Sequence, residues 1–112
     1  MYILIRNNFN NLKSEIKSQI DNGEIKTWKF VFEEERTRLM HIGENNQYGD
    51  VVLRFITTHD EGVECLKILP AVKTDADDVE TAKTHFGVVL GRFSELLNNH
   101  FEEIGYYETY LQ

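Results

Sequence analysis

The sequence is poor in residues that build covalently stapled scaffolds. Its one cysteine, Cys65, excludes a disulfide within the chain. Cys65 falls in a segment of alternating apolar residues, so we expect it to be a small buried hydrophobic side chain. The alternative is a reactive thiol served by His59 or His41. No feature of the sequence calls for an oxidising environment.

Catalytic and metal-binding motifs are also missing. The glycines form no phosphate-binding loop, and no histidine pairs with another at helical spacing. The three potential metal ligands His59, Asp60 and Glu61 are adjacent in sequence, but they are expected to form a tight turn. Glu64 is the candidate for a carboxylate on a covered face, where burial would raise its pKa; the alternative is a strand start with the side chain turned outward. We therefore expect no catalytic residue, metal or cofactor, and leave open whether His41, His59 or Glu64 is functional.

A long apolar run is absent. The run Tyr2-Ile3-Leu4-Ile5 is followed at once by Arg6 and is far shorter than a signal-peptide core or a membrane span. We expect a cytoplasmic protein without membrane contact. The length of 112 residues suits a single domain covering residues 1–112.

Basic residues are scarce in the second half of the chain. Residues 1–56 carry 8 basic and 8 acidic side chains, whereas residues 57–112 carry 4 and 11, so the second half holds the whole net charge of -7. Direct nucleic-acid binding is disfavoured, because it needs clustered Lys and Arg. A solvated helix face is the ordinary explanation, and an acidic surface that orients a partner is the functional one.

Hydrophobic periodicity indicates the order helix, strands, helix. Steps of three and four predict a helix over roughly residues 8–22, while residues 2–6 are either helix or strand. Trp28, Phe30 and Phe32 alternate with polar neighbours, as in a half-buried strand. Further strands are expected near 37–42, 50–58 and 63–69, with short turns that join only antiparallel neighbours. Pro70 is expected to end the last of these strands.

An apolar stripe predicts a long helix over residues 76–104. At ~1.5 Å per residue it would be about 43 Å long and would overhang a sheet of eight-residue strands, about 27 Å at ~3.3 Å per residue. A break at Asn98-Asn99 would remove the overhang. The predicted fold class is α+β: an antiparallel four-stranded meander sheet, flanked by an N-terminal helix and a long C-terminal helix packed on one face.

Three sets of residues are candidate contact surfaces. The acidic face of the long helix comprises Asp77, Glu80, Glu95 and Glu102. A strip of small residues on that helix, where close approach of another element is expected, comprises Thr84, Gly87, Gly91 and Ser94. The outer face of the sheet mixes aliphatic and basic side chains: Lys29, Val31, Val52, Arg54, Ile56 and Lys67.

The function favoured by the sequence is a small acidic protein-binding module. It would act by surface complementarity without catalysis, like an inhibitor, an immunity protein or a chaperone. We expect another protein as partner, with a basic protein as one option, and a homodimer. One alternative is a small-molecule-binding protein or enzyme, with a pocket between sheet and helix near Trp28, Phe30, His41, Glu64 and Gly87. A second alternative is an acidic nucleic-acid mimic.

Overall fold

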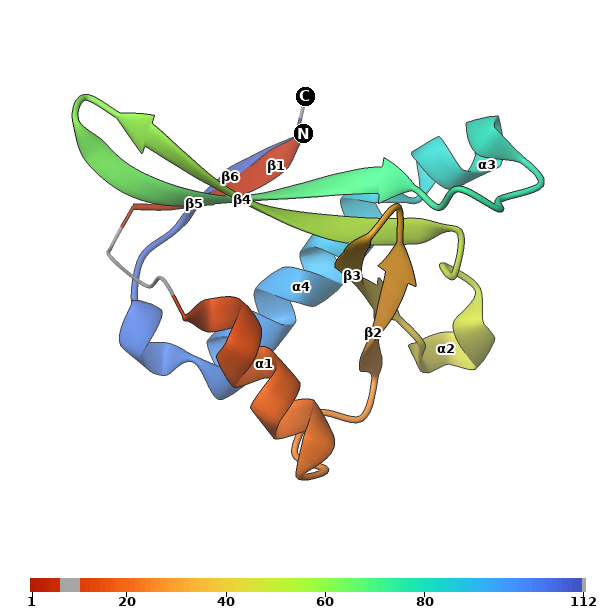
Figure 1. Ribbon diagram of the computed structural model, residues 1–112, viewed down its shortest axis with the longest axis horizontal. Helices are drawn as coiled ribbons and strands as arrows, with labels where there is room; N and C mark the ends of the chain where they lie inside the picture. Colours follow the sequence, from red (N-terminus) through yellow and green to blue (C-terminus); the bar gives the residue numbers. More distant parts are fainter. Residues whose placement is uncertain (7–10, 112) are drawn as a thin grey trace.

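The computed structural model describes residues 1–6 and 11–111. An antiparallel sheet carries helices α1 and α4 on one face (Figure 1). The elements in chain order are β1 (Tyr2–Ile5), α1 (Leu12–Asp21), β2 (Trp28–Glu33), β3 (Arg36–His41), α2 (Gly43–Asn46), β4 (Val51–Asp60), β5 (Val63–Val72), α3 (Val79–Thr84), α4 (Phe86–His100), the 3-10 turn η1 (Glu102–Ile104) and β6 (Glu108–Tyr110). The α+β class predicted from the sequence is confirmed.

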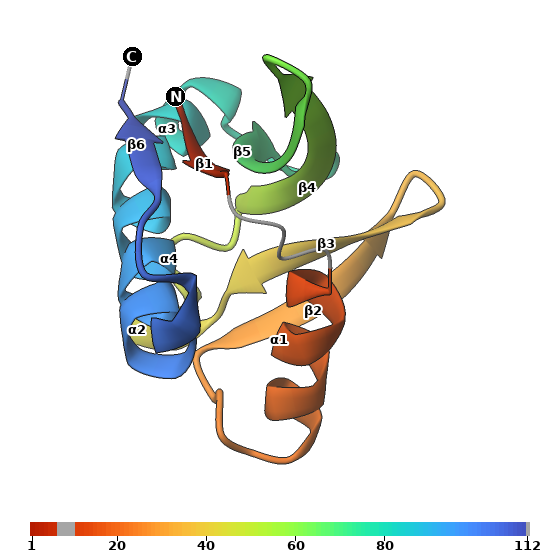
Figure 2. The ribbon, with the colours of Figure 1, turned by 90° about the vertical axis from the view of Figure 1, so that its left-hand side faces the viewer.

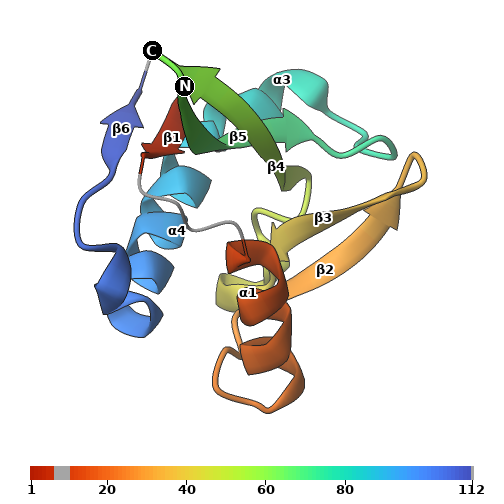
Figure 3. The same cartoon turned by 60° about the vertical axis from the view of Figure 1, so that its left-hand side comes forward.

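The predicted meander forms the strands β2, β3, β4 and β5. Glu34 and Glu35, both at positive φ, connect β2 to β3, and Glu61 and Gly62 connect β4 to β5 in the same way. Two-residue loops of this kind match the twist of antiparallel strands. The β2–β3 hairpin leans away from β4 and β5 toward α1 (Figure 3). Phe32, near its tip, is therefore 73% exposed although it follows the predicted alternation.

The prediction of four strands was incomplete, because in the described part of the chain the sheet has six, in the order β2-β3-β4-β5-β1-β6. Strand β1 pairs with β5, and β6 adds to the other side of β1 (Figure 2). Both are too short to show a clear period, and partners distant in sequence define them. Residues 2–6 thus contain a strand, of residues Tyr2–Ile5.

Pro70 does not end β5, which continues to Val72. Pro70 pairs with Leu53 of β4, whereas the pairing of β5 with β1 reaches only to Ile68. On that side the proline occupies an edge position, where a missing backbone N–H is tolerated.

The expected long helix is interrupted at His85, which separates α3 from α4, and α4 ends at His100. The backbone N–H of His85 bonds to the carbonyl of Ala82, three residues back, so the turn tightens there. Val79 is 45% exposed, so the apolar stripe does not all face the core. For the N-terminal helix, the predicted start at residue 8 lies outside the described residues.

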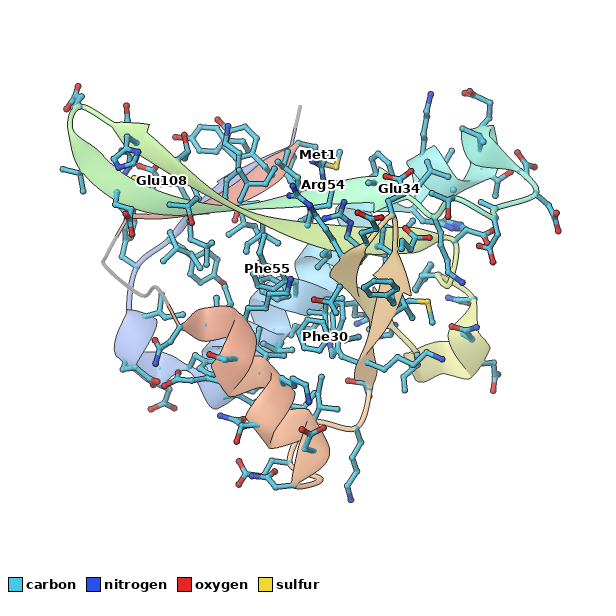
Figure 4. The ribbon with its side chains drawn as sticks, viewed as in Figure 1. Met1, Phe30, Glu34, Arg54, Phe55 and Glu108 are labelled. Carbon is cyan, nitrogen blue, oxygen red and sulfur yellow. The ribbon has the colours of Figure 1, made fainter. Side chains whose placement is uncertain are left out.

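The core lies between the helices and the sheet. Figure 4 shows Phe30 and Phe55 on the face of the sheet toward α1 and α4, and Arg54 on the opposite face. The largest fully buried side chains come from both layers: Phe93, Phe101, Ile3, Ile5, Leu12, Ile16, Leu39, Leu53, Ile68, Leu90, Leu97 and Val51. Among the described residues, every helix is too short or too polar to cross a membrane.

Candidate functional site

A hollow of about 400 Å³ opens between helix α4 and the adjoining ends of β2 and β3. The loop that follows α1, helix α4, and Trp28 and His41 of the two strands each supply part of its wall. Its lining consists of Glu24, Ile25, Lys26, Thr27, Trp28, His41, Gly43, Arg92, Glu95, Leu96, Asn99 and His100. The volume lies within the roughly 300–1,000 Å³ of typical ligand sites.

Two aromatic side chains of the lining, Trp28 and His41, are rigidly placed. Trp28 and His41 are partners in the β2–β3 register and are only 3% and 4% exposed. Their rings meet edge to face with centroids 4.9 Å apart, and the Trp28 ring makes a similar contact with Phe93 at 5.9 Å. Because such contacts restrict ring orientation, one wall of the hollow is preformed.

Gly43 allows the chain to pass close to this pair. A Cβ at Gly43 would lie 2.9 Å from Cε1 of His41 and 3.5 Å from Cβ of Thr27. A side chain there would displace the imidazole. Glycine is therefore favoured at this position for space rather than for an unusual φ.

The α4 wall is polar toward the hollow and apolar beneath it. Arg92, Glu95, Leu96 and Asn99 follow the i, i+3, i+4, i+7 spacing of a single helix face. The guanidinium of Arg92 donates to Oε1 of Glu95 over 3.3 Å. Leu96 is 4% exposed and anchors this face to the core. His100, in the last turn of α4, completes the wall.

The loop wall is held by the end of α1. The backbone N–H groups of Glu24 and Ile25 both donate to the carbonyl of Gln19, at 2.9 and 3.0 Å, and Gly23 takes the left-handed φ of +84° that this turn requires. Ile25 is buried and fixes the loop to the core. Glu24 and the exposed Lys26 on the same loop therefore line the hollow from a defined backbone.

The four carboxylates of the predicted acidic face are exposed but lie on different elements. Asp77 precedes α3, Glu80 is in α3, Glu95 is in α4 and Glu102 is in η1. Two of them have basic partners, since Glu80 lies 3.5 Å from Nζ of Lys83 and Glu95 pairs with Arg92. These pairs reduce the local negative potential that the helix presents.

The predicted strip of small residues meets neighbouring segments at two of its members. A Cβ at Gly87 would be 4.0 Å from Cε of Met1, and the hydroxyl of Tyr107 donates to the carbonyl of Ser94 over 3.4 Å. Gly91 has open space around it, and Thr84 is exposed. Both contacts come from terminal segments of the same chain, and 4.0 Å at Gly87 is an ordinary van der Waals distance, so neither glycine shows the close approach expected from the sequence.

The six residues predicted for the outer sheet face alternate onto the side away from α1 and α4. Their strand partners are given by the register: Val31 with Arg38, Val52 with Ala71, Arg54 with Leu69, Ile56 with Lys67, and Lys29 with Met40. Val52 is only 1% exposed, whereas Lys29 is exposed. Nε of Arg54 is buried without a hydrogen-bond partner among the described atoms.

The remaining candidates lie away from the hollow. His59 and Glu64 face each other across the β4–β5 hairpin, with Nε2 and Oε2 3.9 Å apart. Cys65 is buried, and its thiol donates to the carbonyl of Val63. Within the described ranges, no three His, Cys, Asp or Glu side chains gather closely enough to hold a metal ion.

The structure thus brings Trp28 and His41 of the expected pocket to one site but not the other three residues. Phe30 packs against the core beside Lys13, Glu64 lies near the start of β5, and Gly87 lies near Met1. Of the α4 side chains that line the hollow, the sequence had singled out only Glu95, as part of the acidic face and not of a pocket, and it had not singled out Glu24 or Lys26 of the loop. The helical spacing of the α4 residues could have grouped them, but only the packing shows that this group faces Trp28.

Comparisons with protein-family models, curated proteins and solved structures find no match for this chain.

Proposed function

We propose that this chain is a binding domain that takes up a small molecule in the hollow beside Trp28. The observation that carries the proposal is the combination of a buried Trp28–His41 wall with polar side chains from two separate elements around about 400 Å³. Ligand sites commonly pair apolar walls with a few convergent polar groups.

Preorganisation supports a binding role. The Trp28–His41 contact, the Ile25 anchor and the Leu96 anchor place the lining on elements held by the core. A preformed site loses little conformational entropy when a ligand enters, so even a small contact area supports useful affinity.

The chain has one tryptophan, Trp28, which makes its fluorescence a direct report on the hollow. We would titrate the protein with a library of small polar metabolites and follow Trp28 emission. The expected result is a saturable change with some members. The blocking variant is Asn99→Phe, which adds an aromatic ring to an exposed lining position. The matched control is Lys83→Phe on the exposed surface of α3.

Saturable binding to the wild type and to Lys83→Phe, but not to Asn99→Phe, would support the proposal. A library without any saturable ligand would contradict it, as would binding that Asn99→Phe leaves unchanged.

A second candidate function is protein binding through the outer face of the sheet. Arg38 precedes Leu39 in β3, and Arg54 follows Leu53 in β4. Because Leu39 and Leu53 are paired across these antiparallel strands, the two arginines are neighbours. Nζ of Lys67 lies 4.4 Å from the centroid of the Tyr2 ring. None of the ion pairs between described residues involves Arg38, Arg54 or Lys67. Uncompensated basic groups among aliphatic side chains favour an acidic segment of another protein.

The test of this second function is a pull-down with the wild type and with Arg54→Glu, using Lys83→Glu as the control for added charge. The expected result is loss of the partner with Arg54→Glu alone, together with weaker binding at high salt. Sizing of the purified chain separates a second copy from a different protein. A partner retained equally by all three forms would contradict the assignment.

A further inference from the structure

The charges around the hollow are balanced on each wall. The loop wall carries one carboxylate, Glu24, and one ammonium, Lys26, while the α4 wall carries Arg92 and Glu95. Apart from its two histidines, the lining thus contains two cations and two anions. A ligand with a single charge meets a group of like sign on both walls.

The charged side chains of the loop and of α4 differ in whether they already form an ion pair. Arg92 and Glu95 form an ion pair with each other. Among the described residues Lys26 has no ion-pair partner, and Glu24 accepts a hydrogen bond from Nδ2 of Asn22 at 3.2 Å. Lys26 and Glu24 can therefore bind a charged ligand without breaking an existing salt bridge.

The field of the whole molecule adds a second constraint. The net charge of -7 disfavours anionic ligands, and the balanced hollow has no local excess of positive charge to offset that repulsion. Ile25, Trp28 and Leu96 line the hollow but are each no more than 4% exposed, so they offer a small apolar contact, which suits a ligand with a short hydrocarbon group beside its polar groups.

We propose, building on the small-molecule function above, that the ligand is a small zwitterion with an apolar side chain, of the α-amino acid class. Its carboxylate binds the ammonium of Lys26, its ammonium binds the carboxylate of Glu24, and its side chain lies against Trp28 and Leu96. No bond is made or broken.

Three compounds with the same hydrocarbon chain test the proposal through Trp28 fluorescence. They are leucine, 3-methylbutylamine, which lacks the carboxylate, and 4-methylpentanoate, which lacks the ammonium. Each missing charge removes one charge-assisted contact, so leucine should bind about tenfold more tightly than either analogue. Phenylalanine, phenethylamine and 3-phenylpropanoate form a second matched series.

Single substitutions assign the two charges separately. Lys26→Gln should weaken leucine and 4-methylpentanoate by roughly three- to tenfold and leave 3-methylbutylamine unchanged, since the site is partly exposed. Glu24→Gln should weaken leucine and 3-methylbutylamine and leave 4-methylpentanoate unchanged. Lys17→Gln, on the exposed surface of α1, is the control and should change none of them.

Equal binding of an amino acid and its singly charged analogues would overturn the zwitterion assignment, as would indifference of leucine binding to both loop substitutions. If neither matched series binds but another library compound binds and is blocked by Asn99→Phe, the zwitterion class is wrong and the pocket function stands. If no compound at all binds, the proposed function itself is wrong.

Discussion

Gly43 lies where α2 begins, and the imidazole of His41 occupies the space that a side chain would need. In Gly43→Ala the new Cβ would lie 2.9 Å from Cε1 and 3.2 Å from Nε2 of His41. The ring has little room to move away, because it is 4% exposed and contacts Trp28 at 4.9 Å. The substitution therefore strains the wall of the hollow.

The size of the effect follows from two opposing contributions. Overpacking a dense site costs about 1–3 kcal/mol. The φ of Gly43 is outside the left-handed region, so alanine also restricts the unfolded chain and returns roughly 0.4–1 kcal/mol. We expect Gly43→Ala to lower the free energy of unfolding by about 1–2 kcal/mol.

Gly91→Ala is the matched control. A Cβ at Gly91 would have no atom within 4 Å, and the residue lies inside α4, so this variant should gain about 1 kcal/mol. Urea denaturation followed by Trp28 fluorescence and by circular dichroism measures both variants. If Gly43→Ala is as stable as Gly91→Ala, or if the NMR signals of His41 do not move, the close approach is wrong.

Three further substitutions test other parts of the fold by the same denaturation assay. Glu35→Gly should stabilise the protein by about 1 kcal/mol, because Glu35 has a φ of 64°; an unchanged midpoint would contradict the turn. Glu33→Ala should cost about 1 kcal/mol, because the buried carboxylate accepts from N and Oγ1 of Thr74, both at 2.9 Å; equal stability would contradict this tie. The pKa of Asp78 is lowered first by the Thr81 hydroxyl and then by the Thr81 backbone N–H. Its contribution is present above the unfolded pKa of about 3.9 and lost as the pH falls through the lower folded value. The wild type should thus lose more stability than Asp78→Asn on acidification; parallel pH profiles would refute this.

The strands that sequence patterns predicted well are those with local signals. Trp28 and Phe30 alternate strongly, and the Glu61-Gly62 loop is a typical hairpin turn, so the central meander could be drawn without long-range information. Strand β6 depends on partners such as Leu4, which pairs with Glu108 from the other end of the chain. No local pattern encodes that pairing.

The candidate site, too, is predicted in part by local patterns and in part only by tertiary packing. Alternation placed Trp28 on the core side of the sheet, and the helical period could have put Arg92 and Asn99 on one face. Phe93 and Leu96 pack into the core and so fix the position of α4 on the sheet. This position places the polar face of α4 opposite Trp28. The balanced charges of the hollow become visible only once loop and helix are brought together.

The most direct test of a ligand site beside Trp28 is a proton–nitrogen NMR titration with leucine. We expect the indole N–H signal of Trp28 to shift saturably, together with backbone amides of residues 24–28 and 92–100, while signals from the outer sheet face stay in place. Unmoved Trp28 signals up to high leucine concentration, or shifts confined to the strands around Arg54, would contradict the account.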